Sequence, residues 1–541
     1  MVSGGSDELA DRSLVANGPD HCVAGALWRA GAADRVTRAH SGPLADASGS
    51  IVVGVDLATA AVRVACSTVM GEVMASAESP IPAPVRSASG TSEQDPSSWW
   101  PAARATIRAA TDALGAARSR IRAISVAATS GTVVLVGPDG EPEGPALMYD
   151  DRRATTEARI AQEAGAARWR ALGLTITPTF SLAKVGWMAR SGLISGALRV
   201  AHAADFLVWK LVGRPTPSDW SNSLKTGYDP LRGEWAGEAL DALGVAREVL
   251  PDVEAPTSVV GTVCVSSALE TGLPLGTEVV LGMTDGCAAQ VACGTSHVGQ
   301  FVTVLGTTLV VKGVQGALYP DPTGAVYSHR HPSGWWLPGG ASNTGGEALS
   351  VFAQDRFPDL ERAAARRGPA SVVRYPLLRA GERFPFVAPQ ARAFDLGSPS
   401  DEVESFRSSL EGVAFVERLA YDHLRHLGMQ VVAPILSAGG GSRSELWSAI
   451  RATTLGAPLA RVAHPDTSFG ACVLAAAGTV FDDVPAATAA MVREVSTIDP
   501  LPEENEALAS NYRRFIDELA RRGWIESELA TYARRAHGIG T

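Results

Sequence analysis

Residues 51–68, IVVGVDLATAAVRVACST, contain two short apolar runs joined by a turn of small and hydroxyl residues. A second stretch of this kind lies at residues 299–313, GQFVTVLGTTLVVKG, where Gly306 to Thr308 form the turn. Runs rich in β-branched residues that are separated by turn residues predict strands. The recurrence of one strand pair therefore predicts a duplicated domain, with a cleft between the two halves.

Outside these two stretches, further strands are predicted at 121–128 (IRAISVAA) and 131–142 (GTVVLVGPDGEP), and a helix is predicted from Trp99 to Ala117. Alternation of strands with amphipathic helices predicts a fold of the α/β class. Residues 1–49 show no sustained periodicity, and we expect them to be a disordered leader.

The overall composition excludes several classes of function. The 541 residues carry a net charge of −10, so nucleic acid is an unexpected partner, because phosphate binding needs clustered basic residues. The chain has only four lysines, which we attribute to the nucleotide composition of the gene rather than to chemistry; they are Lys184, Lys210, Lys225 and Lys312.

The six cysteines have no C-x-x-C spacing, and we expect them to be reduced and mostly buried, as is typical of cytoplasmic proteins. The N-terminus lacks the basic start and apolar block of a signal peptide. The longest uncharged run, 291–311, is broken by polar residues and predicts no membrane span.

A third glycine-rich segment lies at 437–447, SAGGGSRSELW, where an apolar strand passes into a helix. Glycines at such a junction let a phosphorylated ligand approach the backbone and the helix N-terminus. A flexible linker is the alternative here, just as an ordinary tight turn is the alternative for Gly306 to Thr308.

Taken in this order, the segments resemble the FGGY carbohydrate kinases, members of the actin and Hsp70 ATPase superfamily, over residues 50–482. The resemblance also rests on the motifs GMTDGCAAQ at 282–290 and AATSGTVVLVGPDGEPEGPALMYDDRR at 127–153. Three further motifs look closest to the D-ribulose kinases of cyanobacteria and plants: SDWSNSLKTGYD at 218–229, GASNTGG at 340–346 and YPLLRAGERFPF at 375–386.

This resemblance implies two actin/Hsp70-like (ribonuclease H-like) α/β domains with an active-site cleft between them. Domain I, which binds the sugar and carries the catalytic base, is expected at 50–292 with a return segment at 466–482. Domain II, which binds the nucleotide, is expected at 293–465, and 483–541 is expected to be a helical extension.

Asp285 in GMTDG stands where the family keeps its catalytic base, at the end of a strand facing the cleft. A carboxylate there accepts the proton of the sugar hydroxyl as the oxygen attacks the γ-phosphorus of ATP. The alternative is that Asp285 caps a helix beginning at Gly286.

Asp56 matches the acid of the first phosphate loop, which faces the sugar and positions magnesium through water. Thr59 keeps the hydroxyl of that loop, but Ala58 stands where the family prefers glycine. If this position needs a positive φ, alanine costs about 1 kcal/mol and weakens ATP binding or turnover.

The resemblance assigns the remaining ATP contacts to the other two glycine-containing segments. Gly306, Thr307 and Thr308 are expected to bind the β- and γ-phosphates. Gly440 and Gly441 are expected at the adenosine, with Trp447 either a wall for the base or a residue of the core.

Ser130 and Asp151 match sugar-facing positions of the family, beside Asp56 and Asp285. Arg153 offers Asp151 an alternative partner, which would make both residues structural. Asp95 is explained at least as well by helix capping. The pair His329 and His331 has the alternate spacing of two metal ligands on one strand face, but a solvent-facing strand is the preferred interpretation.

The resemblance thus implies a kinase, expected in the cytoplasm, that uses ATP and Mg²⁺ to convert free D-ribulose to D-ribulose 5-phosphate. Another acceptor (D-xylulose, L-ribulose or ribitol) and a non-catalytic actin-like ATP-binding protein are the alternatives. The expected partner is a small sugar, with neither nucleic acid nor membrane, and with a homodimer left open.

Overall fold

The computed structural model describes residues 49–536, 538 and 539. These residues fall within a single compact unit. The predicted leader, apart from Gly49, and Cys22 lie outside the described residues.

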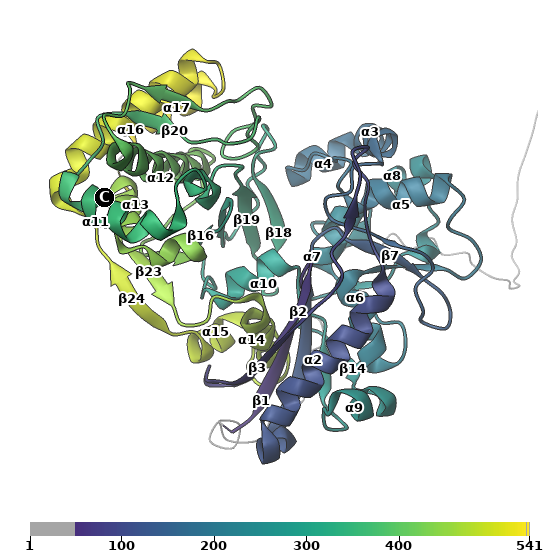
Figure 1. The fold of residues 1–541 in the computed structure, drawn as a ribbon. Coiled ribbons are helices and arrows are strands. Elements are labelled where there is room, and N and C mark those ends of the chain that lie inside the picture. Colours follow the sequence, from purple (N-terminus) through teal and green to yellow (C-terminus); the bar gives the residue numbers. More distant parts are fainter. Residues whose placement is uncertain (1–48, 537, 540–541) are drawn as a thin grey trace, which may run out of the picture. The chain divides into compact units, whose positions relative to one another are not determined.

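The first large sheet has six strands, which come from residues 51–280 (Figure 1). In spatial order they are β14 (Val259–Thr262), β15 (Glu278–Val280), β6 (Ile121–Ala128), β1 (Ile51–Leu57), β2 (Ala61–Thr68) and β3 (Val73–Pro80). The 51–68 segment forms the antiparallel β1–β2 hairpin that the sequence predicts, with Ile51 opposite Thr68.

The second large sheet has seven strands. In spatial order they are β18 (Tyr327–Arg330), β19 (Trp336–Ala341), β17 (Leu309–Gly313), β16 (Phe301–Leu305), β22 (Ile435–Ala438), β23 (Leu459–Val462) and β24 (Glu494–Ile498). The 299–313 segment forms the antiparallel β16–β17 hairpin.

The two sheets share one pattern of strand directions, which bears out the duplication inferred from sequence. The order β3-β2-β1-β6-β15-β14 has antiparallel, antiparallel, parallel, parallel and antiparallel neighbours. The order β19-β17-β16-β22-β23-β24 has the same five relationships. The second sheet differs by the added edge strand β18.

Both faces of the first sheet are covered because its strands are apolar on both sides. Val53 and Val55 of β1 pack into a cluster with α2 (Trp99–Ala113), whereas Val52 points to the other face and packs with α14 (Thr467–Thr479). Successive strand residues face opposite sides of a sheet, so near-continuous apolar runs suit a doubly covered sheet. Figure 1 shows α2 running along β2 and β3.

Helix α2 ends four residues earlier than the predicted helix, at Ala113, and is followed by a 3-10 segment, Gly115–Arg120. Asp95 caps the preceding 3-10 turn through the N–H of Ser97, at 2.9 Å, as the capping interpretation has it.

The second sheet packs against a core built around α12 (Glu402–His426), which is buried along most of its length. α13 (Glu445–Leu455), α16 (Asn505–Arg521) and α17 (Ser527–Arg535) join this core. The C-terminal extension is not wholly helical, because Glu494–Ile498 form β24 at the edge of the sheet. Strand pairing supplies a reason: β23 would otherwise leave its backbone groups unpaired.

The described cysteines are all free thiols, in agreement with the prediction. Four of them are buried, and Cys264 is partly exposed. Among the described residues, no helix combines the length and apolar character that a membrane span requires.

Candidate functional site

Asp285 lies at the N-terminus of α10 (Asp285–Ala292) rather than at the end of a strand. β15 ends at Val280, a short loop follows, and Thr284 occupies the N-cap position. Both sequence interpretations of Asp285 therefore need correction, because it neither ends the strand nor caps the helix. Its Oδ1 accepts the N–H of Gly286 at 2.7 Å, and the side chain stays partly exposed.

Several positively polarised groups surround the Asp285 carboxylate. Burial raises the pKa of Asp285, while the N–H of Gly286, the ammonium groups of Lys225 and Lys312, and the N–H of Ser130 lower it. A raised pKa makes a carboxylate a stronger proton acceptor, and the cations keep it ionised. These opposing influences suit a general base.

Asp56, the penultimate residue of β1, is 4% exposed and lies within electrostatic reach of Asp285. Burial, Asp285 and Asp466 raise the pKa of Asp56 to about 7, against the lowering influence of Arg63, whose Nη1 lies 3.4 Å from Oδ2. Oδ1 is buried without a hydrogen-bond partner. A buried carboxylate oxygen in this position calls for a cation or a hydrogen-bond donor.

The turn between β1 and β2 accommodates Ala58 in a closed hairpin. The Ala58 N–H donates to the carbonyl of Ala61 at 3.0 Å. The carbonyl of Thr59 accepts from Nε2 of Gln94, also at 3.0 Å. Thr59 and Ala58 are both partly exposed at this turn, directly after Asp56 and Leu57.

The turn between β16 and β17 turns its carbonyl groups towards a neighbouring segment. The N–H of Gly346 donates to the carbonyl of Gly306 at 2.8 Å, and the N–H of Glu347 donates to that of Thr307 at 3.0 Å. In the described part of the chain, the amides of Thr307 and Thr308 have no hydrogen-bond acceptor. Neighbouring unpaired amides form a nest of the kind that binds phosphate oxygens.

The motif GASNTGG lies directly behind this turn. A Cβ atom on Gly345 would lie 2.4 Å from the carbonyl carbon of Thr308, and one on Gly346 would lie 2.5 Å from the carbonyl oxygen of Gly306. Only glycine permits this approach. Sequence reasoning used the motif for classification and missed this structural role, although the tandem glycines are a visible signal.

A cavity of about 690 Å³ opens beside the second turn. Five residues predicted to bind ATP are among those lining it: Gly306, Thr307, Gly440, Gly441 and Trp447. The volume falls in the range of small-molecule sites, roughly 300–1,000 Å³. Thr59 and Thr308 do not line this cavity.

Trp447 belongs to the core and also lines the cavity, and its contact with the nucleotide base stays a prediction. It is 3% exposed, belongs to the core around α12, and donates its indole N–H to the carbonyl of Leu410 at 3.0 Å. Trp447 is also one of the residues that line the cavity. Its position is thus fixed by the core, which makes the cavity wall rigid.

Comparison with known proteins now decides the family. The model of the FGGY family of carbohydrate kinases, N-terminal domain, matches residues 51–292, and that of the C-terminal domain matches residues 289–479. The chain belongs to the FGGY family of carbohydrate kinases. It is accordingly a phosphotransferase enzyme of the two-domain α/β kinase fold, acts on a sugar, and by family membership uses ATP.

Individual relatives are named for a pentose substrate. The chain is 30% identical to the xylulose kinase of Streptomyces rubiginosus over 418 residues, 74% of this chain and 82% of that protein. The structure of the xylulose kinase from Rhodospirillum rubrum is 26% identical, covers 87% of this chain and 99% of its own, and superposes with a TM-score of 0.78. The narrower resemblance to D-ribulose kinases stays a prediction.

Of the residues predicted to contact the sugar, Ser130 follows β6, and its Oγ is buried without a partner. Both carboxylate oxygens of Asp151, by contrast, accept hydrogen bonds from protein groups. Its carboxylate is 0% exposed and accepts from the guanidinium and N–H of Arg153 and from the N–H of Ser92. The assignment of Asp151 as a sugar contact is therefore replaced by the alternative, a structural pair with Arg153.

His329 and His331 are not on a solvent-facing strand, contrary to the preferred interpretation. Both rings are buried, with exposed fractions of 2% and 0%. Burial lowers the pKa of His331 to about 4, and burial together with Lys312 and Lys225 lowers that of His329 well below its usual value. Within the described ranges, no three His, Cys, Asp or Glu residues are grouped so as to hold a metal ion.

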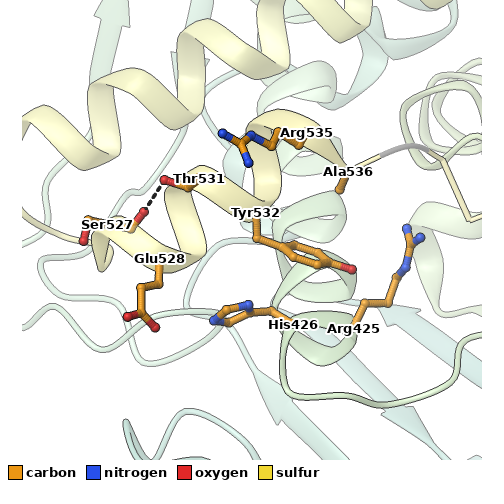
Figure 2. A pocket seen from close by; sticks show the side chains of 8 residues that line it. All are labelled: Arg425, His426, Ser527, Glu528, Thr531, Tyr532, Arg535 and Ala536. Carbon is orange, nitrogen blue, oxygen red and sulfur yellow. Dashed lines mark hydrogen bonds between the residues drawn. The ribbon is translucent and has the colours of Figure 1, made fainter.

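A second cavity, of about 650 Å³, lies between the end of α12 and α17 (Figure 2). The ring of Tyr532 lies 5.3 Å from that of His426, and Thr531 donates to the carbonyl of Ser527 at 2.8 Å. None of the predicted site residues lines this cavity, so it is separate from the kinase site.

Proposed function

We propose that the chain transfers the γ-phosphoryl group of ATP to the terminal hydroxyl of a free ketopentose, D-ribulose, and so produces D-ribulose 5-phosphate. The observation that carries this proposal is the grouping of Asp285, Asp56 and Ser130: Asp285 acts on Asp56, the N–H of Ser130 acts on Asp285, and Asp56 Oδ1 and Ser130 Oγ have no hydrogen-bond partner. A polyhydroxylated acceptor needs such short polar groups on rigid elements.

In the proposed reaction Asp285 accepts the proton of the acceptor hydroxyl. The hydroxyl oxygen bonds to the γ-phosphorus as the bond from that phosphorus to the bridging oxygen of ADP breaks. The free amides of Thr307 and Thr308 bind phosphate oxygens and hold the group in line. The proton remains on the Asp285 carboxylate, whose raised pKa favours this transfer.

Magnesium fits the surroundings of Asp56. Oδ1 of Asp56 has no hydrogen-bond partner, and the carboxylates of Asp285 and Asp466 raise the pKa of Asp56. The negative charge around Asp56 would therefore be compensated by a bound cation. Asp56 would hold the ion through water, and the bound ion would supply charge compensation for the phosphates.

The choice of D-ribulose rests on the resemblance of the 218–229 motif to D-ribulose kinases, and part of this motif lies close to Asp285. Asp219 caps α7 (Trp220–Ser223) through the N–H groups of Ser221 and Asn222, and the turn that follows brings Lys225 to the base. D-xylulose is the second candidate, because the Streptomyces relative that is 30% identical is a xylulose kinase.

The test is ATP consumption by the purified protein with D-ribulose, D-xylulose, L-ribulose, ribitol or no sugar, followed by identification of the phosphorylated product. We expect strong stimulation by D-ribulose. Stimulation by D-xylulose alone would overturn the choice of acceptor, and the absence of stimulation by every sugar would favour an actin-like ATP-binding protein that is not a sugar kinase. Cytoplasmic location is part of the proposal, whereas the homodimer stays a prediction.

A further inference from the structure

Lysine is rare in this chain, yet lysines gather at the candidate base. Four of the 47 basic Lys and Arg residues are lysines, and the charges of two of them, Lys225 and Lys312, act on the Asp285 carboxylate. A third, Lys184, is buried under the loop after Ser130, where it donates to the carbonyls of Gly131 and Met148. Lys210 instead pairs with Glu141, at 2.5 Å.

Lys225 presents an unused ammonium group beside Ser130. Its aliphatic stem covers Gly131, where an added Cβ would lie 3.4 Å from Cδ. Among the described residues, Lys225 Nζ makes no hydrogen bond or ion pair. It lies 5.8 Å from the centroid of the Tyr327 ring. A lysine ammonium has three donors and no acceptor, so it requires an oxygen that accepts.

His329 is a buried side chain without a partner. It is 2% exposed, and both ring nitrogens lack a hydrogen bond. Burial and the charges of Lys312 and Lys225 keep the ring neutral by lowering its pKa. A neutral imidazole has one donor and one acceptor, and burying both unsatisfied is costly.

The strand register places these groups on one face of the second sheet. Tyr327 pairs with Gly339, which pairs with Lys312, so the side chains of Tyr327 and Lys312 share a face, and His329 follows two residues after Tyr327 on that same face. Gly339 leaves room for the lysine, because a Cβ there would lie 2.9 Å from Lys312 Cγ.

That face is turned towards α10 and the 218–229 motif. Leu337, the partner of His329 in the sheet, packs in one cluster with Cys287 of α10, and a Cβ on Gly286 would lie 3.2 Å from Lys312 Cε. The indole N–H of Trp220 donates to the carbonyl of Arg330 at 2.9 Å and ties α7 to β18. Two distant parts of the chain thus converge beside Asp285.

We propose that Lys225 and His329 form a subsite for an open-chain ketose, in which Lys225 donates to the carbonyl oxygen and His329 binds a neighbouring hydroxyl. A carbonyl oxygen only accepts, which matches the ammonium; a hydroxyl both donates and accepts, which matches the neutral imidazole. This subsite rests on the proposed function. It explains why the enzyme would prefer a ketose to the polyol of the same carbon skeleton.

The first experiment measures, by titration calorimetry, the Kd of D-ribulose, D-xylulose and ribitol for the wild type and for Lys225→Met. Loss of the ammonium donor should weaken binding of the preferred ketose at least about tenfold. Ribitol carries a hydroxyl in place of the carbonyl, and the proton of that hydroxyl needs an acceptor that the ammonium does not offer, so we expect a clearly smaller loss for ribitol. The matched control is Lys210→Met, whose lysine lies outside the subsite and which is expected to bind both as the wild type does.

Equal loss of ketose and ribitol binding in Lys225→Met, or no loss of either, would overturn the assignment of Lys225 to the carbonyl. The KM for ATP and the thermal unfolding midpoint are measured in parallel. Both should stay unchanged, since a merely structural lysine would lower the midpoint.

The second experiment replaces His329. His329→Ala should weaken the binding of ketose and ribitol alike, by about tenfold, because the hydroxyl is common to both, and His329→Gln, which keeps a donor and an acceptor, should restore part of the affinity. Wild-type affinity in His329→Ala would overturn its role.

These outcomes separate the subsite from the proposed function. A wild type that binds ketose selectively but phosphorylates no pentose refutes the function and leaves the subsite standing. A wild type that phosphorylates a ketopentose, with Lys225 and His329 variants that bind it normally, refutes the subsite alone.

Discussion

The hairpins β1–β2 and β16–β17 occupy equivalent places in two sheets of matching topology, yet they present groups of opposite polarity. The first presents a carboxylate and the second presents backbone N–H groups. Asp56 is the penultimate residue of β1, whereas Val304 holds that place in β16. The second turn instead offers the free amides of Thr307 and Thr308 and is backed by Gly345 and Gly346. The same hairpin topology therefore carries a carboxylate in the first sheet and free backbone N–H groups in the second. A carboxylate suits a cation and N–H groups suit phosphate oxygens, so the two hairpins can bind different partners in a phosphoryl transfer.

Removing the acid of the first hairpin is the largest test of this contrast. Asp56→Asn keeps the size of the side chain and deletes its charge, so we expect kcat to fall about 10²- to 10³-fold. The fold should be retained, since burial already disfavours the charged form of Asp56. Steady-state kinetics with ATP and the preferred sugar measure the effect.

Asp466→Asn is the matched control for Asp56→Asn, because Asp466 acts on Asp56 only through its charge and is exposed. Its kcat should stay within about threefold of the wild type. An Asp56→Asn enzyme that is equally active would remove the distinction between the two hairpins.

Gly345→Ala should displace the turn of the second hairpin, because Gly345 packs against the backbone of that turn. Its Cβ would lie 2.4 Å from the carbonyl carbon of Thr308, so the turn must shift and its amides lose their alignment. We expect the KM for ATP to rise about tenfold or more, with a smaller change in the KM for the sugar. Gly237→Ala, whose methyl group meets no atom within 4 Å, should behave as the wild type; equal kinetics for both variants would contradict the supporting role of Gly345.

The loop after β6 is held by the buried amino group of Lys184, which donates to the carbonyls of Gly131 and Met148, and this gives a pH test. Burial lowers the pKa of Lys184 from 10.5 to about 7. Between these values the unfolded chain binds more protons than the folded one, so the free energy of unfolding should rise with pH, by up to about 1.4 kcal/mol per pH unit.

Denaturant unfolding of the wild type and Lys184→Met between pH 7 and 10 measures this slope. Lys184→Met should be less stable because the carbonyls of Gly131 and Met148 lose their donor, and the pH-dependent difference from the wild type should grow as pH rises. Parallel stability curves for the two proteins would show that burial does not lower the pKa of Lys184.

The smallest expected effect belongs to Ala58→Gly. The turn already closes through the bond from the Ala58 N–H to the Ala61 carbonyl, so glycine should change stability by less than about 1 kcal/mol and the KM for ATP by less than about twofold. A tenfold gain in kcat/KM would show instead that alanine strains the first phosphate loop.

The hairpins, the duplication and the cavity around Gly306 and Gly440 could be predicted from sequence, because turn residues and apolar runs are local signals. Asp285 was placed close to its true position, but the boundary between β15 and α10 was missed by a few residues. Such boundaries depend on where the backbone stops pairing, which a single sequence does not encode.

The wrong sequence predictions concern residues whose surroundings are set by contacts between distant parts of the chain. Asp151 matched a sugar-facing position, yet Arg153 and the N–H of Ser92 occupy its carboxylate. The histidines of β18 were assigned to solvent because alternation alone does not say which face of a strand is covered. The rarity of lysine was attributed to gene composition, and only the fold shows that Lys225 and Lys312 converge on one carboxylate.

The central claim is that Asp285 accepts the proton of the sugar, and Asp285→Asn tests it most directly. The measurement is single-turnover phosphorylation of the preferred pentose, together with calorimetric Kd values for ATP and sugar. Loss of a positioned general base predicts a rate about 10²- to 10⁴-fold lower, with both Kd values within about threefold of the wild type. A phosphorylation rate within a few-fold of the wild type, in a protein that binds both ligands normally, would contradict the account.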